Sequence, residues 1–237
     1  MAAKNKFGFL SSNGLKLIAV AAMLIDHVNV IFVGPEHNVW RGIGRIAFPI
    51  FAFMIAQGAV RTKNKALYAL RLFAFGVISE IPYDLAVKGT FLEFTRQNVY
   101  FTLLLGLISV YCLDFLRKNH LGVLGIITTI ACGLGAHFLA SEYSFMGVVV
   151  ITFMYIFSTI KTDARYLGFA LSGLMTVFVY RYPLDLGIMP TQVYAAFCVI
   201  PLALYNGKRG KKMNKYFFYA FYPAHLLILY LIKTFIA

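Results

Sequence analysis

The chain has 237 residues and a net charge of +13. Of its residues, 60% are hydrophobic and only 13% are charged. Soluble domains carry about 25% charged residues, so this composition excludes an ordinary soluble globular protein and predicts an integral membrane protein. Apolar stretches of about 20 residues, each long enough to cross a bilayer as a helix, recur with short polar joints between them. We therefore expect an all-α, polytopic helical bundle that forms a single domain over residues 1–237.

The apolar stretches predict nine spans in chain order. We place them at about residues 13–33, 40–60, 66–86, 98–117, 121–139, 143–160, 164–180, 189–205 and 215–236. The first stretch continues past Asp26 and His27 through Phe32, which is too long for a cleaved signal peptide, so we expect it to remain as a span. The three cysteines lie in apolar stretches without CxxC spacing, so neither a disulfide framework nor a metal site is predicted.

The basic residues are distributed unevenly between the joints. With the N-terminus placed in the cytoplasm, 16 of the 22 lysines and arginines lie on one side of the membrane. The positive-inside rule then puts this side in the cytoplasm and the C-terminus outside, in a multi-pass protein of a bacterial cytoplasmic membrane. Topology accounts for the positive charge, so no nucleic acid is expected as a partner.

Ionisable and polar residues from several spans fall at similar depths in the outer half of the membrane. Asp26 and His27 lie about 9 Å below the outer end of the first span at helical rise. The same layer takes in Arg45, Glu80, Asn98, Glu142, Tyr143, Arg181, Asp185 and His225. An isolated charge in hydrocarbon costs roughly 2.5–3.5 kcal/mol, so these groups are expected to face one another around a wet cavity. The alternative is a set of buried ion pairs that only fix helix packing.

Helical geometry suggests which of these groups pair. Neighbours on a helix point about 100° apart, so Asp26 is expected to pair with Arg45 and to leave His27 free to exchange protons. Glu80 and Asp84 are four residues apart, but Pro82 between them is expected to end or kink the helix.

Five segments resemble the TraX family in order and spacing: "IDHVNVIF", "GRIAFPIFAF", "QNVYFTLLLG", "YSFMGVVVI" and "FYAFYPAHL". The family is named for the conjugation protein that acetylates the N-terminus of F-type pilin. The resemblance covers nearly the whole chain and implies an integral membrane acyltransferase that uses acetyl-CoA, distantly similar to membrane acyltransferases with an essential histidine on an early helix. Carried over residue by residue, it singles out Asp26, His27, Arg45, Asn98, Tyr143, Tyr222 and His225.

Acyl transfer from a thioester needs a base, and a neutral histidine, with a reference pKa of about 6.5, serves as one at physiological pH. We expect His27 to be this base, with Asp26 holding Arg45 in place. The oxyanion needs donors, for which Arg45, Asn98, Tyr222 and His225 are candidates. His225 is expected to lie deeper than His27, where it donates to the thioester oxygen or satisfies the buried tyrosine.

The donor is cytosolic, so its pantetheine arm is expected to thread between the helices toward the outer polar layer. Its phosphates would then lie near Lys63, Lys65, Lys208 and Arg209. Glu80 and Asp84 are added to the substrate-binding set, and the acceptor is an amine or hydroxyl of a protein N-terminus, glycan, lipid or small molecule. The alternatives are a proton- or cation-coupled transporter of small molecules, in which Asp26, His27 and Glu80 relay protons, and a scaffold without chemistry.

Overall fold

The computed structural model describes residues 8–34, 39–179 and 191–236. Within these ranges the protein is an all-α bundle, as predicted, and each of the predicted apolar stretches forms a helical segment. By length and composition, four helices in this part of the chain are suited to cross a membrane: Ser12–Val33, Val39–Arg61, Val99–Lys118 and Tyr216–Phe235. The chain is therefore a membrane protein, while the number of spans and their orientation stay predictions.

The first half of the chain contributes five α-helices, two of which continue into π-helical turns. These elements are α1 (Ser12–Val28) with η1 (Asn29–Val33), α2 (Val39–Arg45), α3 (Ala47–Arg61), α4 (Lys65–Tyr83) with η2 (Asp84–Lys88), and α5 (Val99–Lys118). The second half contains α6 (Gly122–Phe138), α7 (Ser144–Thr159), α8 (Ala164–Leu174), the 3-10 helices η3 (Met175–Val179) and η4 (Thr191–Cys198), α9 (Val199–Ala203) and α10 (Lys215–Ile236).

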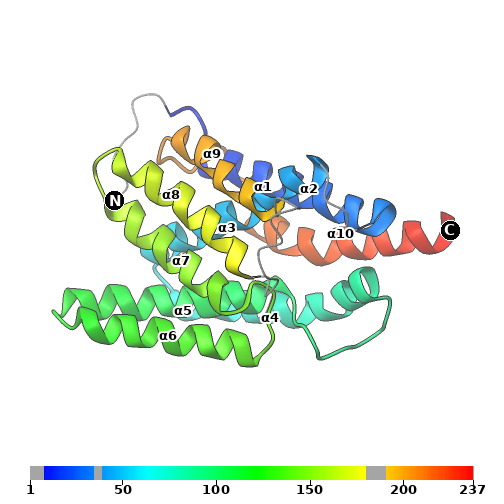
Figure 1. Ribbon diagram of the computed structural model, residues 1–237, viewed down its shortest axis with the longest axis horizontal. Coiled ribbons are helices and arrows are strands. Elements are labelled where there is room, and N and C mark those ends of the chain that lie inside the picture. Colours follow the sequence, from blue (N-terminus) through cyan, green and yellow to red (C-terminus); the bar gives the residue numbers. More distant parts are fainter. Residues whose placement is uncertain (1–7, 35–38, 180–190, 237) are drawn as a thin grey trace.

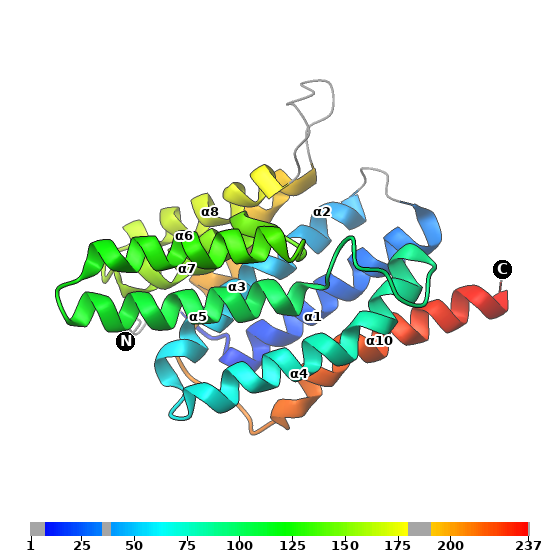
Figure 2. The same cartoon turned by 90° about the horizontal axis from the view of Figure 1, so that it is seen from below.

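The helices form an elongated bundle in which α5 and α6 lie side by side at one edge, while α1 and α2 lie toward the other and α10 runs between α1 and α4 (Figure 1). Turned by 90°, the bundle shows α4 and α10 running together along a further edge (Figure 2). The α2–α3 span is 72% buried, compared with 33%, 44% and 28% for the other three candidate spans. It is therefore the central element against which the rest of the bundle packs.

Proline explains one break in the helices, and the structure corrects the expected effect of another. The second predicted span is interrupted at Ile46, because Pro49 has no N–H to donate to the carbonyl of Arg45. In contrast, α4 continues through Pro82, where we expected an end or a kink. The helix is maintained because the Asp84 N–H donates to the carbonyl groups of Glu80 and Ile81 in the preceding turn. From Asp84 the chain then continues as a π-helical turn.

The outer surface of the bundle is apolar, as a lipid-facing surface should be. On α6, the side chains of Val123, Ile126 and Phe138 are 74%, 59% and 82% exposed. Soluble monomers rarely expose contiguous apolar patches of this kind. Asp26, Arg45 and His225, in contrast, are buried inside the bundle, at the site described next.

Candidate functional site

A cavity of about 550 Å³ lies between α1, α3, α4, α5 and α10, with a wall completed by the loop between α6 and α7. The side chains that α1 contributes to its lining differ along the helix. Ser12, Asn13 and Lys16 line one end, Met23 lies in the middle, and Asp26 and His27 line the other end. The cavity therefore connects a basic end, near the start of α1, with an ionisable end about 22 Å away at helical rise.

His27 forms a hydrogen-bonded pair with His225 on the last helix. The Nδ1 atom of His27 lies 2.8 Å from Nε2 of His225, whose own Nδ1 lies 2.8 Å from the carbonyl oxygen of Phe221. A carbonyl oxygen only accepts, so Nδ1 of His225 must carry a hydrogen. In neutral rings, Nε2 of His225 then accepts from Nδ1 of His27, and this assignment leaves Nε2 of His27 with a free lone pair.

This pairing corrects the expected depth of His225, because the two imidazoles are in contact, with ring centroids 5.0 Å apart. His225 is buried and does not line the cavity, whereas the half-buried His27 does. Any effect of His225 on a ligand therefore passes through His27 or Tyr222, whose ring lies 5.7 Å from His225.

Asp26 forms the predicted ion pair with Arg45 and a second ion pair, with Arg41, that was not predicted. Its Oδ2 atom accepts from Nη2 of Arg45, and its Oδ1 lies 2.6 Å from Nη1 of Arg41. Arg45 also donates to the side-chain oxygen of Gln192, 3.2 Å away on η4. The carboxylate thus ties α1 to two successive turns of α2, and through Arg45 to η4.

Gly44 allows this approach of α1 and α2. A Cβ atom at Gly44 would overlap the side chain of Asp26, and a larger side chain would have to displace it. The segment "RGIGR" therefore combines two arginines on one helical face with the small residue that the close packing requires. This spacing was the signal that could have identified Arg41 from the sequence.

Three further groups surround the ionisable end. Tyr222 lines the cavity, and its buried hydroxyl has no hydrogen-bond partner among the described residues. Tyr143 also lines it and stacks on Phe48, with ring centroids 3.7 Å apart. Glu142 lines it as well, 4.0 Å from a guanidinium nitrogen of Arg96. The end of the cavity therefore offers a basic imidazole nitrogen, an unpaired hydroxyl and a carboxylate.

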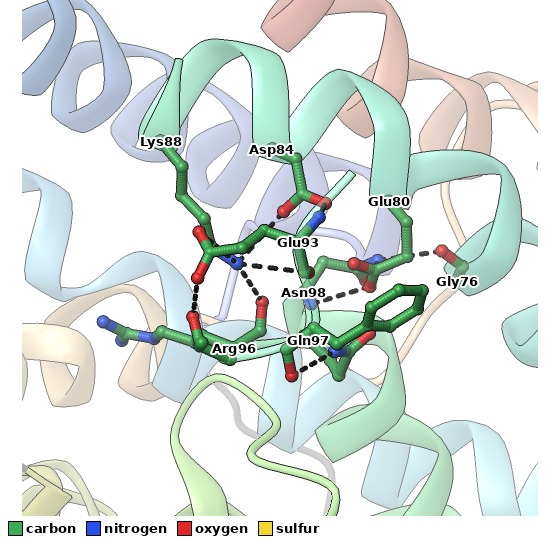
Figure 3. Close-up of polar contacts among 10 residues, drawn as sticks. Gly76, Glu80, Asp84, Lys88, Glu93, Arg96, Gln97 and Asn98 are labelled. Atoms are coloured by element: carbon green, nitrogen blue, oxygen red, sulfur yellow. Dashed lines mark hydrogen bonds and ion pairs between the residues drawn. The ribbon is translucent and has the colours of Figure 1, made fainter. Parts of the chain in front are cut away.

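Glu80, Asp84 and Asn98 lie elsewhere, contrary to their predicted place in the cavity. They fasten the segment that joins α4 to α5 (Figure 3). Asn98 caps α5 by accepting from the Tyr100 N–H, and its own amide donates to Glu80 and to the Gly76 carbonyl. Because these donors are already engaged, Asn98 is not placed to stabilise an oxyanion.

Asp84 is fully buried in the same network, where we had predicted a substrate ligand. Its Oδ2 accepts from the Glu93 N–H at 2.8 Å, and its Oδ1 lies 3.1 Å from Nζ of Lys88. Lys88 also donates to the carbonyl of Arg96 at 2.7 Å. The carboxylates of Glu80 and Asp84 therefore face this segment instead of the cavity, because α4 continues without a break through Pro82 (Figure 3).

The basic end of the cavity contains only one of the four predicted phosphate ligands. Arg209 lines it, whereas Lys63, Lys65 and Lys208 are exposed and do not. The other cations that line this end are Lys16, Arg61 and Arg71. From the sequence we had assigned these three only to topology. Lys16 and Arg71 lie within predicted spans instead of in the joints between them, which was the available signal, whereas Arg61 is the last residue of α3 and carried no such signal.

The remaining polar residues predicted for the layer, Arg181 and Asp185, lie outside the described residues. Among the described residues, no group of histidine, cysteine and carboxylate side chains has the arrangement of a metal site.

The sequence of this chain is similar to those of known proteins. The TraX protein family matches residues 11–233. A protein of Dichelobacter nodosus, described as "Probable fimbrial assembly protein FimC, serogroup H1", is 30% identical over 245 residues, which cover 94% of this chain and 95% of the relative. The uncharacterized protein RP591 of Rickettsia prowazekii (strain Madrid E) is 34% identical over 97 residues, 41% of this chain and 35% of that protein. No solved structure matches the chain. Since the family match extends from the start of α1 into the last helix, the chain belongs to the TraX family.

Proposed function

We propose that the protein is a membrane-embedded acyltransferase that moves an acetyl or other short acyl group from cytosolic acyl-CoA to an amine or hydroxyl at the outer side of a bacterial cytoplasmic membrane. The observation that carries this proposal is the hydrogen-bonded chain from the Phe221 carbonyl through His225 to His27. It leaves Nε2 of His27 as a proton acceptor at the wall of the cavity.

In this proposal the acceptor attacks the thioester carbonyl while Nε2 of His27 takes its proton. The carbonyl oxygen, on which negative charge develops, accepts a hydrogen bond from the unpaired hydroxyl of Tyr222. The intermediate collapses by breaking the C–S bond, and His27 returns the proton to the leaving thiolate. The products are the acylated acceptor and free CoA, and no covalent acyl-enzyme is needed.

His225 acts in this scheme as a positioning residue, since it contacts His27 and does not line the cavity. Asp26 holds α1 against α2 and fixes the orientation of the turn that carries His27. Both residues therefore support the rate of the chemical step through His27.

The acceptor class rests on the relative described as a probable fimbrial assembly protein, which supports a protein subunit of a pilus over a glycan or a lipid. Glu142 at the cavity wall favours an amine over a hydroxyl, because a carboxylate attracts an ammonium group before its deprotonation.

The test is release of free CoA from acetyl-CoA by purified protein, with and without a peptide that carries a free N-terminal amine. His27→Ala should lower kcat by about 10²- to 10⁴-fold at saturating donor, as expected for a lost general base. His137→Ala is the matched control, because this histidine is exposed at the end of α6 and does not line the cavity. Normal turnover by the His27 variant would reject His27 as the base.

His225 variants separate a positioning role from the donor-binding role expected from the sequence. His225→Ala should lower kcat and leave the KM for acetyl-CoA unchanged, and His225→Gln should recover part of the rate because its amide oxygen can accept from Nδ1 of His27. A raised KM at normal kcat would instead support donor binding. Proton-coupled uptake of a small molecule without CoA release would favour the transporter alternative.

A further inference from the structure

Four cations gather at the end of the cavity opposite His27. Lys16 on α1, Arg61 on α3, Arg71 on α4 and Arg209 in the loop before α10 all line it. The loop is held in place because the backbone N–H groups of Ser12 and Asn13 donate to the carbonyls of Lys208 and Arg209. Elements from both halves of the chain thus bring these charges to one position.

These charges are not neutralised within the part of the chain that the structure describes. None of the ion pairs formed there involves Lys16, Arg61, Arg71 or Arg209. Lys16 instead lies over the ring of Phe218, with Nζ 5.0 Å from its centroid. The Nε of Arg71 is buried without a hydrogen-bond partner. Cations on low-dielectric walls focus a positive potential into a cavity, so this end is suited to an anion.

The positive-inside rule does not explain this arrangement by itself. That rule concerns charges near the ends of the spans and in the loops beside them. Arg61 and Arg209 are exposed in such positions, as Arg117, Lys161 and Lys63 are. Lys16 and Arg71 instead lie more than one turn inside their helices, are half-buried and face the cavity.

The distance between the two ends of the cavity suggests what the anion belongs to. Lys16 and His27 are eleven residues apart on one helix, which separates them by about 16 Å along its axis. An extended pantetheine arm is about as long as the backbone of four residues, roughly 14 Å. The cavity wall between the ends is largely apolar, with Phe51, Met54 and Leu72 among its residues.

We propose that Lys16, Arg61, Arg71 and Arg209 bind the phosphate groups of the nucleotide end of the acyl donor, so that the pantetheine arm spans the cavity and its thioester reaches His27. The identity of the donor rests on the proposed function, whereas the phosphate site rests on the four cations. Four cations suit the several phosphates of a free nucleotide thioester better than the one phosphodiester of a carrier-bound arm.

Binding of 3′-phospho-ADP, the nucleotide end of CoA without its arm, tests the site in nanodiscs of phosphatidylcholine. Lys16→Gln/Arg71→Gln should weaken this binding by roughly 10- to 100-fold, the range for lost charge-assisted hydrogen bonds. The control Arg117→Gln/Lys161→Gln removes two charges from exposed positions outside the cavity and should retain wild-type affinity. An equal loss in both double variants would overturn the proposal, as would an effect confined to Lys63→Gln/Lys65→Gln.

A donor without phosphates separates this proposal from the proposed function. Acetyl-pantetheine should serve the wild type and Lys16→Gln/Arg71→Gln equally well, which also shows that the variant is folded, while the KM for acetyl-CoA rises only in the variant. Nucleotide binding that depends on the four cations, in a protein that transfers no acetyl group, would retain the phosphate site and reject the acyltransferase. A lipid headgroup site is the outcome if phosphatidylglycerol binds through these cations and 3′-phospho-ADP does not, and the proposal would then be wrong.

Discussion

Replacing Asp26 by asparagine removes a carboxylate that forms ion pairs with both Arg41 and Arg45. The side chains of Asp26 and Arg45 are only 12% and 6% exposed, so water screens the interactions of these charges poorly. Removing one partner of a buried ion pair costs about 3–5 kcal/mol in free energy of unfolding, and here one substitution breaks two ion pairs. We therefore expect Asp26→Asn to cost about 5 kcal/mol. Arg41→Gln should cost less, because the pair between Asp26 and Arg45 remains.

The assay is denaturation of the detergent-solubilised protein by sodium dodecyl sulfate, followed by the fluorescence of Trp40, the single tryptophan, which adjoins Arg41 on α2. Asp26→Asn/Arg45→Gln should lose at least about 1 kcal/mol less than the sum of its single variants, because each single substitution already breaks the ion pair between Asp26 and Arg45. Asp163→Asn makes the same change at an exposed position and should be neutral. Additive losses from Asp26→Asn and Arg45→Gln would refute the energetic coupling inferred from the ion pair.

Three further predictions concern packing, chemistry and orientation. Gly44→Ala should destabilise the protein by about 1–3 kcal/mol because its Cβ overlaps Asp26, whereas Gly135→Ala, with only one atom within 4 Å, should be tolerated in thermal unfolding. Tyr222→Phe should lower kcat for acetyl transfer by about 10²- to 10³-fold with little change in donor KM, and an unchanged kcat would exclude its hydroxyl as the oxyanion donor. In a background without the native cysteines, Thr90→Cys should react with an impermeant thiol reagent added to intact cells and Lys211→Cys should not, and the reverse pattern would invert the proposed orientation.

The helices were predictable from the sequence because apolar length alone requires them in a bilayer. The breaks within the helices were harder to predict, because proline has opposite effects at two positions. Pro49 breaks the second span, because the chain can turn at Ile46, whereas Pro82 is accommodated by a π-helical turn. Which outcome applies depends on the backbone that follows, and a residue pattern does not contain that information.

A contact in the candidate site was predictable where two residues of opposite charge lie at the same depth in neighbouring spans, as Asp26 and Arg45 do. Depth alone was misleading for Glu80 and Asp84, because helix rotation turns their carboxylates toward the segment before α5 (Figure 3). The contact between His27 and His225 was not predictable either, since it depends on how the first and last helices pack together.

The two histidines are 198 residues apart, while Asp26 is 15 and 19 residues from its two arginines. At a synthesis rate of about 5–20 residues per second, this difference separates the two contacts by roughly 10–40 s. The charge on α1 therefore meets its counter-ions as soon as α2 has been made and need not wait unpaired in the membrane. His27 can remain without His225 for longer, because a neutral imidazole carries no charge that needs a counter-ion. An incomplete chain that ends before α10 would thus have this charge paired yet would lack the hydrogen bond between His27 and His225, and under the proposed mechanism it would be inactive until synthesis is complete.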